Sequence, residues 1–107
     1  MKHYFVYITT GDREEAETIG RQIVEEHLAA CVNIIGEMHS VYWWNDEVND
    51  AHETILIAKT MEDRLDALRE RVVTLHSYDC PCVVALPIEA GHPPYLNWIL
   101  KETRDSE

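Results

Sequence analysis

Residues 40–59 constrain the fold of this chain more than any other stretch. Aromatic and β-branched residues flank the polar pair Asn45–Asp46, and the second flank ends in an apolar run at residues 54–58. Asn and Asp tolerate the left-handed backbone that a two-residue hairpin turn requires. The stretch therefore predicts a long β-hairpin. One end should lie in the core, and the end with the two tryptophans should project beyond it.

The aromatic residues near the turn fall on both faces of this hairpin. With a two-residue turn, Trp44 lies opposite Glu47 and Trp43 lies opposite Val48. Successive side chains of a strand point to opposite faces, so Tyr42 and Trp44 share one face and Trp43 lies on the other. The arm is too short to be covered by its own chain. We therefore expect Tyr42, Trp43 and Trp44 to lie in an interface between subunits.

The same register has a second consequence nearer the base of the hairpin. It pairs His39 with His52 on one face, close enough to chelate a metal ion. A bulge at Gly36, where a bend is expected, would leave this pairing intact. A wider turn would abolish it.

The other segments alternate between strand and helix patterns. Strand patterns are short apolar runs, and helix patterns carry apolar residues every three or four positions. We expect strands at residues 3–9, 31–35 (continuing into the hairpin) and 83–88, and helices at residues 13–28, 61–76 and 95–104.

The element order is βαββαβ with a terminal helix, which predicts a ferredoxin-like α+β sandwich. Its four-stranded antiparallel sheet should have two helices on one face and the first and third strands in the centre. The apolar residues on the other face then require an oligomer.

Four residues indicate where helices begin or where a strand lies in the sheet. Asp12 followed by Glu15 forms a capping-box pattern at the start of the first helix. Thr60 is a candidate cap for the second helix. Pro87 lacks an amide donor, so the last strand should lie at an edge of the sheet.

Length and composition restrict the class of protein. The chain has 107 residues, which predicts one domain spanning residues 1–107. The formal charge of −11 argues against nucleic acid as a partner, because phosphate binding needs clustered Lys and Arg. The sequence has no apolar run of membrane-spanning length and goes straight into a strand pattern, so we expect a cytoplasmic protein. The odd count of three cysteines argues for reduced thiols.

Several stretches together resemble one family, the CutA divalent-cation tolerance proteins. They are Glu-His-Leu-Ala-Ala-Cys-Val-Asn-Ile at residues 26–34, Ser-Val-Tyr-Trp-Trp at 40–44, Lys59–Thr60, His-Ser-Tyr-x-x-Pro at 76–81, Leu-Pro-Ile at 86–88 and Tyr-Leu-x-Trp at 95–98. The resemblance implies a ferredoxin-like fold similar to PII signalling proteins, and a tight homotrimer. It also implies binding of divalent metal, copper most often, and a role in metal tolerance without a known catalytic reaction.

Three residues depart from the family pattern. Asp46 stands where the family usually has Gly in the hairpin turn, which leaves a wider turn as an alternative. Cys82 stands where a Glu usually follows the loop proline, so a thiolate would replace a carboxylate. His27 stands where a long basic side chain is common.

The candidate metal ligands are the soft donors Cys31, Cys80, Cys82 and His76. Thiolate and imidazole select copper and zinc over magnesium and calcium. Each residue also has a simpler interpretation. Cys31 would be a small buried hydrophobe, Cys80 and Cys82 an exposed loop pair, and His76 a cation at a helix C-terminus.

A second set of candidates consists of Lys59, Tyr78, Tyr95 and Trp98, which could line a ligand cleft. Lys59 would contact an anion or carboxylate there. The aromatic residues are alternatively explained by core and interface packing.

Three functions compete. The first is a trimeric metal-binding protein of cation tolerance, and the second is a PII-like module that binds a small anionic ligand between subunits. The third is an acylphosphatase-like enzyme, which needs a phosphate-cradling loop after the first strand. Asp12 in that loop would repel phosphate, so we expect no enzymatic activity.

Overall fold

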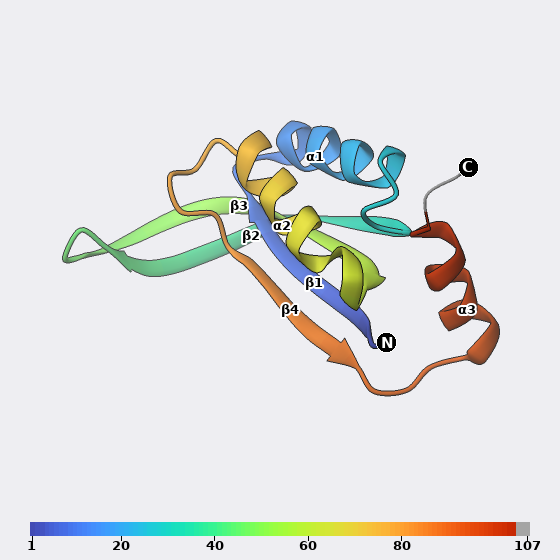
Figure 1. The fold of residues 1–107 in the computed structure, drawn as a ribbon. Coiled ribbons are helices and arrows are strands. Elements are labelled where there is room, and N and C mark those ends of the chain that lie inside the picture. The colour runs from blue at the N-terminus through green and yellow to red at the C-terminus, as the bar shows by residue number, and fades with distance from the viewer. Residues whose placement is uncertain (105–107) are drawn as a thin grey trace.

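The computed structural model describes residues 1–104 (Figure 1). The elements along the chain are β1 (His3–Thr10), α1 (Arg13–Glu25), β2 (Cys31–Trp44), β3 (Glu47–Met61), the 3₁₀ turn η1 (Glu62–Arg64), α2 (Leu65–Leu75), β4 (Val83–Ile88) and α3 (Pro93–Glu102). The strands form one antiparallel sheet in the order β2-β3-β1-β4. This confirms the predicted α+β architecture, with β1 and β3 in the centre and β4 at an edge.

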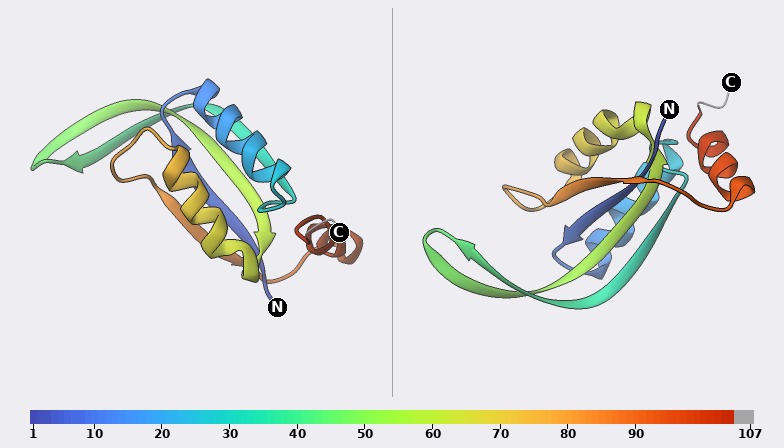
Figure 2. Two further views of the ribbon diagram at one scale, coloured as in Figure 1. Left: turned by 45° about the horizontal axis from the view of Figure 1, so that its top comes forward. Right: turned by 90° about the horizontal axis from the view of Figure 1, so that it is seen from below.

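Helices α1 and α2 lie side by side on one face of the sheet, as the left panel of Figure 2 shows. The core lies between them and the inward side chains of β1 and β3. Its fully buried members are Val6, Ile8, Ala16, Ile19, Ile23, Ala29, Leu56, Ala58, Leu68 and Val72. Helix α1 approaches the sheet closely at Gly20, where an added Cβ would lie 3.0 Å from Val32 Cγ2 and 3.1 Å from Leu56 Cδ1.

The hairpin has the predicted two-residue turn. Asn45 and Asp46 both have positive φ, 52° and 63°, as a type I′ turn requires. Trp44 pairs with Glu47 in register, so the wider turn is excluded. The register shifts once, at a bulge between Ile35 and Met38 that contains Gly36. The tip projects well beyond the body, and the molecule measures 46 × 27 × 22 Å (Figure 1).

The second face of the sheet carries no helix along most of its length (right panel of Figure 2). We call it the open face. Three of its apolar side chains are half exposed: Ile35 at 50%, Val84 at 50% and Leu86 at 55%. Tyr42 and Trp44 continue this face along the hairpin, whereas Trp43, 73% exposed, lies on the opposite side.

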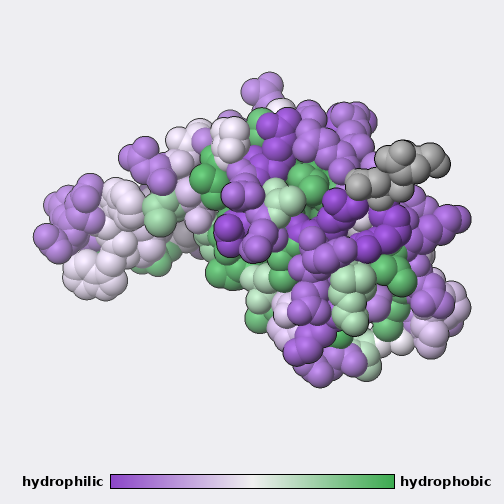
Figure 3. Space-filling model, viewed as in Figure 1, coloured by the Kyte–Doolittle hydropathy of each residue, from purple (hydrophilic) through white to green (hydrophobic). Residues whose placement is uncertain are grey.

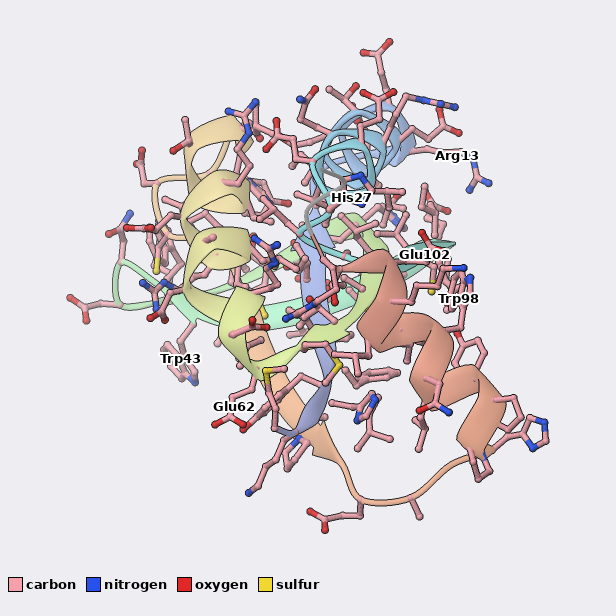
Figure 4. The ribbon with its side chains drawn as sticks, turned by 45° about the vertical axis from the view of Figure 1, so that its right-hand side comes forward. Arg13, His27, Trp43, Glu62, Trp98 and Glu102 are labelled. Atoms are coloured by element: carbon pink, nitrogen blue, oxygen red, sulfur yellow. The ribbon has the colours of Figure 1, made fainter. Side chains whose placement is uncertain are left out.

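Helix α1 ends three residues earlier than predicted, because His27 takes the role that Gly usually has. His27 has a φ of 59°, and its N–H donates to Val24 O at 3.0 Å. Leu28 N–H donates to Ile23 O at 2.9 Å, which completes a Schellman motif. The His27 ring also contacts α3, with Nδ1 lying 2.9 Å from Glu102 O (Figure 4).

The starts of α2 and α3 also differ from the prediction. Thr60 does not cap α2, since it pairs with Tyr4 inside the sheet and its hydroxyl donates to Leu28 O at 2.7 Å. The turn η1 follows β3, and α2 begins only at Leu65. Helix α3 begins at Pro93 instead of Tyr95, because proline suits a first helical position.

Candidate functional site

The structure divides the candidate residues between two ends of the sheet. Cys31 pairs with Lys59, which in turn pairs with Phe5 near the start of β1. Cys82 lies at the other end of β1, where Thr9 N–H donates to its carbonyl at 3.4 Å. These two levels of β1 are about 13 Å apart. Cys31 is therefore separated from Cys82 within one chain, and also from His76 and Tyr78, which contact the Thr9 end.

The first group, which we call the α3-end cluster, consists of Cys31, Asn33, Lys59, Tyr95 and Trp98. Tyr95 OH lies 3.6 Å from Cys31 Sγ. Lys59 Nζ donates to Asn33 Oδ1 at 3.0 Å and lies 5.7 Å from the centre of the Tyr95 ring. The Tyr95 and Trp98 rings are stacked with centroids 5.5 Å apart. Figure 4 shows Trp98 on the outer side of α3.

This cluster combines one ammonium group with an aromatic surface. Its contact with Cys31, followed by burial, raises the pKa of Tyr95, while Lys59 opposes the rise. Tyr95 therefore keeps its proton at neutral pH and can donate a hydrogen bond. An ammonium, a hydroxyl and stacked rings can together bind a small anion that has a planar part.

The second group lies in a groove of about 660 Å³ between the hairpin and the loop that follows α2. We call it the hairpin groove. Its lining residues are Tyr7, Thr9, Met38, Ser40, Val41, Tyr42, Trp44, Glu53, Tyr78, Asp79, Cys80 and Cys82. It therefore contains three of the predicted metal and cleft residues, namely Tyr78, Cys80 and Cys82, together with Tyr42 and Trp44 of the predicted interface.

Glu53 is the central polar group of the hairpin groove. Its carboxylate accepts hydrogen bonds from Ser40 Oγ at 2.6 Å and from Tyr78 OH at 2.9 Å. Burial, followed by the hydrogen bond to Glu53, raises the pKa of Tyr78 strongly. The sequence reasoning missed Glu53, because nothing in the local pattern distinguishes it from the solvated acids around it.

The side chain of His76 is fully buried, and both of its ring nitrogens have partners. Nε2 lies 2.8 Å from Thr9 O, and Tyr78 N–H donates to Nδ1 at 3.1 Å. These contacts fit one neutral tautomer, with the proton on Nε2. A metal ion could bind His76 only if one of these hydrogen bonds were broken.

Glu15 connects the start of α1 to the loop that carries the groove residues. Glu15 N–H donates to Asp12 Oδ1 at 2.8 Å, which confirms the predicted cap. Its carboxylate accepts from Gly11 N–H at 2.9 Å and from Ser77 N–H at 2.8 Å. Burial acts to raise the pKa of Glu15, but the hydrogen bonds from Gly11 and Ser77 outweigh it and lower that pKa. Glu15 therefore holds the loop as a carboxylate.

The predicted metal ligands do not form a complete site within one chain. Across residues 1–104, no three His, Cys, Asp or Glu side chains are placed to hold a metal ion together. Cys31, Cys80 and Cys82 are free thiols, and Cys80 is exposed. Metal binding by these cysteines and His76 thus stays a prediction that requires further ligands.

Comparison with known proteins places these features in a family. The family model described as CutA1 divalent ion tolerance protein matches residues 4–102. The chain is 42% identical to the divalent-cation tolerance protein CutA of Archaeoglobus fulgidus over 97 residues, which cover 91% of this chain and 94% of that protein. It is 46% identical to the chloroplastic CutA 1 of Oryza sativa over 101 residues, which cover 94% of this chain and 57% of the rice protein.

Solved structures agree with this assignment. The Cut A1 protein of Thermus thermophilus superposes with a TM-score of 0.93 at 43% identity, covering 95% of this chain and 99% of that one. CutA1 from Oryza sativa gives a TM-score of 0.94 at 44% identity, covering 99% and 97%. The family model and the proteins from Archaeoglobus fulgidus and Thermus thermophilus are named for divalent-cation tolerance, and these names give no enzymatic activity.

The comparisons overturn the expected cytoplasmic location. The rice relative is named chloroplastic, and the solved protein from Archaeoglobus fulgidus is described as periplasmic. The prediction failed because nothing in the composition of a folded domain marks its compartment. Within residues 1–104, no helix is long and apolar enough to cross a membrane. The match across nearly the whole chain leads to one conclusion: this protein belongs to the CutA1 family of divalent-ion tolerance proteins.

Proposed function

We propose that this protein assembles as a homotrimer that binds divalent metal ions, copper foremost and zinc second, in divalent-cation tolerance. The open face is the observation that carries the assembly. Ile35, Val84 and Leu86 are half exposed there. A contiguous apolar face of this kind is typical of an interface between subunits. Figure 3 shows further apolar residues at the surface where the hairpin joins the body.

The hairpin supports three subunits in preference to two. Trp44 and Trp43 lie on opposite sides of the same arm and are 48% and 73% exposed. Covering both sides requires two neighbouring subunits. A cyclic trimer gives every subunit two neighbours, whereas a dimer gives only one.

The metal preference follows from the donor types. The thiols of Cys31, Cys80 and Cys82 favour copper or zinc over magnesium or calcium. The net charge of −11 raises the local concentration of cations without discriminating among them. Because no three donors converge in the described part of one chain, the remaining ligands would come from a second subunit or from water.

Titration calorimetry with Cu(II) at low and high salt tests this proposal. Salt should screen the weak binding to the acidic surface and leave a tighter class. We expect Cys82→Ser to weaken the tight class by at least about tenfold, or about 1.4 kcal/mol. Ser77→Ala, in the loop that follows α2, serves as the matched control variant. Unchanged binding in Cys82→Ser, Cys80→Ser and Cys31→Ser would show that the cysteines do not form the tight class.

The α3-end cluster favours a second function, a PII-like module that binds a small anion in a cleft between subunits. Lys59 is the cation of this cluster and lies over the ring of Tyr95, which stacks on Trp98. Titration of carboxylates and nucleotides without metal tests this function. Lys59→Met should abolish anion binding, whereas Lys101→Met, an exposed lysine on α3, should leave it unchanged. Equal binding by both variants would remove the support for this function.

A further inference from the structure

We propose that His39 and His52 form a separate two-histidine site for a transition-metal dication, with Zn(II) as its simplest probe, on the hairpin. This site uses none of the cysteines and stands whether or not they bind metal. It lies on the face of the hairpin opposite to Trp44. Metal bound there would join the two arms of the projecting hairpin.

The register brings the two histidines together. His39 is the direct partner of His52 across β2 and β3. In a two-residue hairpin the pair that closes the turn, Trp44 with Glu47, is hydrogen-bonded, and the pairs alternate from there. Counting back makes His39 and His52 a non-hydrogen-bonded pair. Such pairs have Cα atoms about 4.5 Å apart and the closest side chains in the ladder.

The two rings are in contact. Their centroids are 5.4 Å apart, and the ring planes are inclined by 25°. The bulge lies beyond Met38, on the far side from the turn, so it does not disturb this pair. Opposed imidazoles at this spacing can supply two ligands to one ion after a small rotation.

Each ring also contacts a carboxylate. His39 Nε2 lies 2.8 Å from Asp50 Oδ2, and His52 Nδ1 lies 3.6 Å from Glu37 Oε2. Metal-binding histidines usually give their second ring nitrogen to such a carboxylate, which orients the ring and makes it a better ligand. This arrangement leaves Nδ1 of His39 and Nε2 of His52 as the ligating atoms.

Solvent would complete the coordination. The four side chains of His39, Asp50, His52 and Glu37 are all at least 57% exposed, so both rings can turn without losing packing. Imidazole suits zinc, copper and nickel, whereas magnesium and calcium prefer oxygen ligands. No third protein ligand converges on the pair in residues 1–104, which predicts a chelate that exchanges readily with free metal.

Calorimetric titration of the full chain with zinc chloride at high salt tests the proposal. We expect His39→Gln/His52→Gln to lose one binding event per chain, and each single variant to bind at least about tenfold more weakly. His92→Gln removes an exposed histidine on another element and should bind like the parent. The double variant His39→Val/Val41→His keeps the number of histidines. It moves the β2 histidine from the position opposite His52 to the position opposite Asp50. It should lose the chelate as well.

The outcomes separate this site from the cysteine sites. Zinc should also slow amide exchange in the hairpin of the parent and leave it unchanged in His39→Gln/His52→Gln. If the double variant keeps the stoichiometry, affinity and exchange protection of the parent, the proposal is overturned. Loss of all binding in Cys82→Ser with full binding in the double variant overturns it too, and assigns the metal to the thiols.

Discussion

Both faces of the sheet carry apolar side chains, but the side chains are buried on one face and exposed on the other. On the covered face, Ile8 and Leu56 are fully buried beneath α1 and α2. On the open face, Val84 and Leu86 are at least half exposed. A single chain is stabilised by the first face alone. The difference supports the proposal that the open face, together with the projecting hairpin, contacts other copies of the chain.

We expect the largest effect on stability from a substitution on the open face. Trp44→Ala should destabilise the assembly by about 3–5 kcal/mol per site, because a large aromatic side chain is removed from an interface. The melting temperature should then fall on dilution. Thermal denaturation at several protein concentrations measures this. If the variant melts like the parent at every dilution, Trp44 is a surface residue and the two faces do not differ in the way described.

A substitution on the covered face gives the comparison with Trp44→Ala. Leu56→Ala should lower the free energy of unfolding by about 2–5 kcal/mol, because it leaves a cavity beneath α1. The loss should not depend on subunit contacts, since Leu56 is 0% exposed within one chain. Urea denaturation of a dilute sample checks this. A loss below about 1 kcal/mol would show that the core relaxes around the change.

A smaller effect is expected where α1 meets the sheet. Gly20→Ala adds a methyl group at 3.0 Å from Val32 Cγ2 and 3.1 Å from Leu56 Cδ1. Overpacking of this kind costs about 1–3 kcal/mol and outweighs the better helix propensity of Ala. Comparing Arg21→Ala with Arg21→Gly, at an exposed position of the same helix, measures the propensity effect without the packing effect. A more stable Gly20→Ala variant would contradict the close approach.

The smallest effect concerns pH. The lowered pKa of Glu15 means that its carboxylate stabilises the fold above its unfolded pKa of 4.5, and that this contribution is lost as the pH falls through the folded value. Glu15→Gln should therefore cost about 1–2 kcal/mol at neutral pH and progressively less in acid. Urea denaturation from pH 7 to pH 3 measures the difference, with Glu17→Gln as the exposed control. A pH-independent difference would exclude the carboxylate as the cause.

Local chemistry predicted the elements better than their ends. Asn45 and Asp46 fixed the hairpin register, because turn chemistry depends on adjacent residues. The end of α1 was missed because His27 adopts a left-handed backbone that its contact with Glu102, distant in sequence, helps to hold. Thr60 looked like a cap because strand pairing with Tyr4 is invisible in a local pattern.

The candidate site shows the same limit. The residue types pointed to soft ligands, but their grouping depends on strand order. Cys31 and Cys82 lie at opposite ends of the sheet, and Glu53 meets Tyr78 only through tertiary structure. By contrast, the pairing of His39 with His52 followed from the turn alone, and the structure confirms it.

Light scattering at micromolar concentration tests most directly whether the open face is an interface. We predict a mass of three chains for the parent protein, and a shift towards smaller species for Trp44→Ala on dilution. A parent protein with the mass of one chain would contradict the assignment of the open face and the hairpin to contacts between subunits.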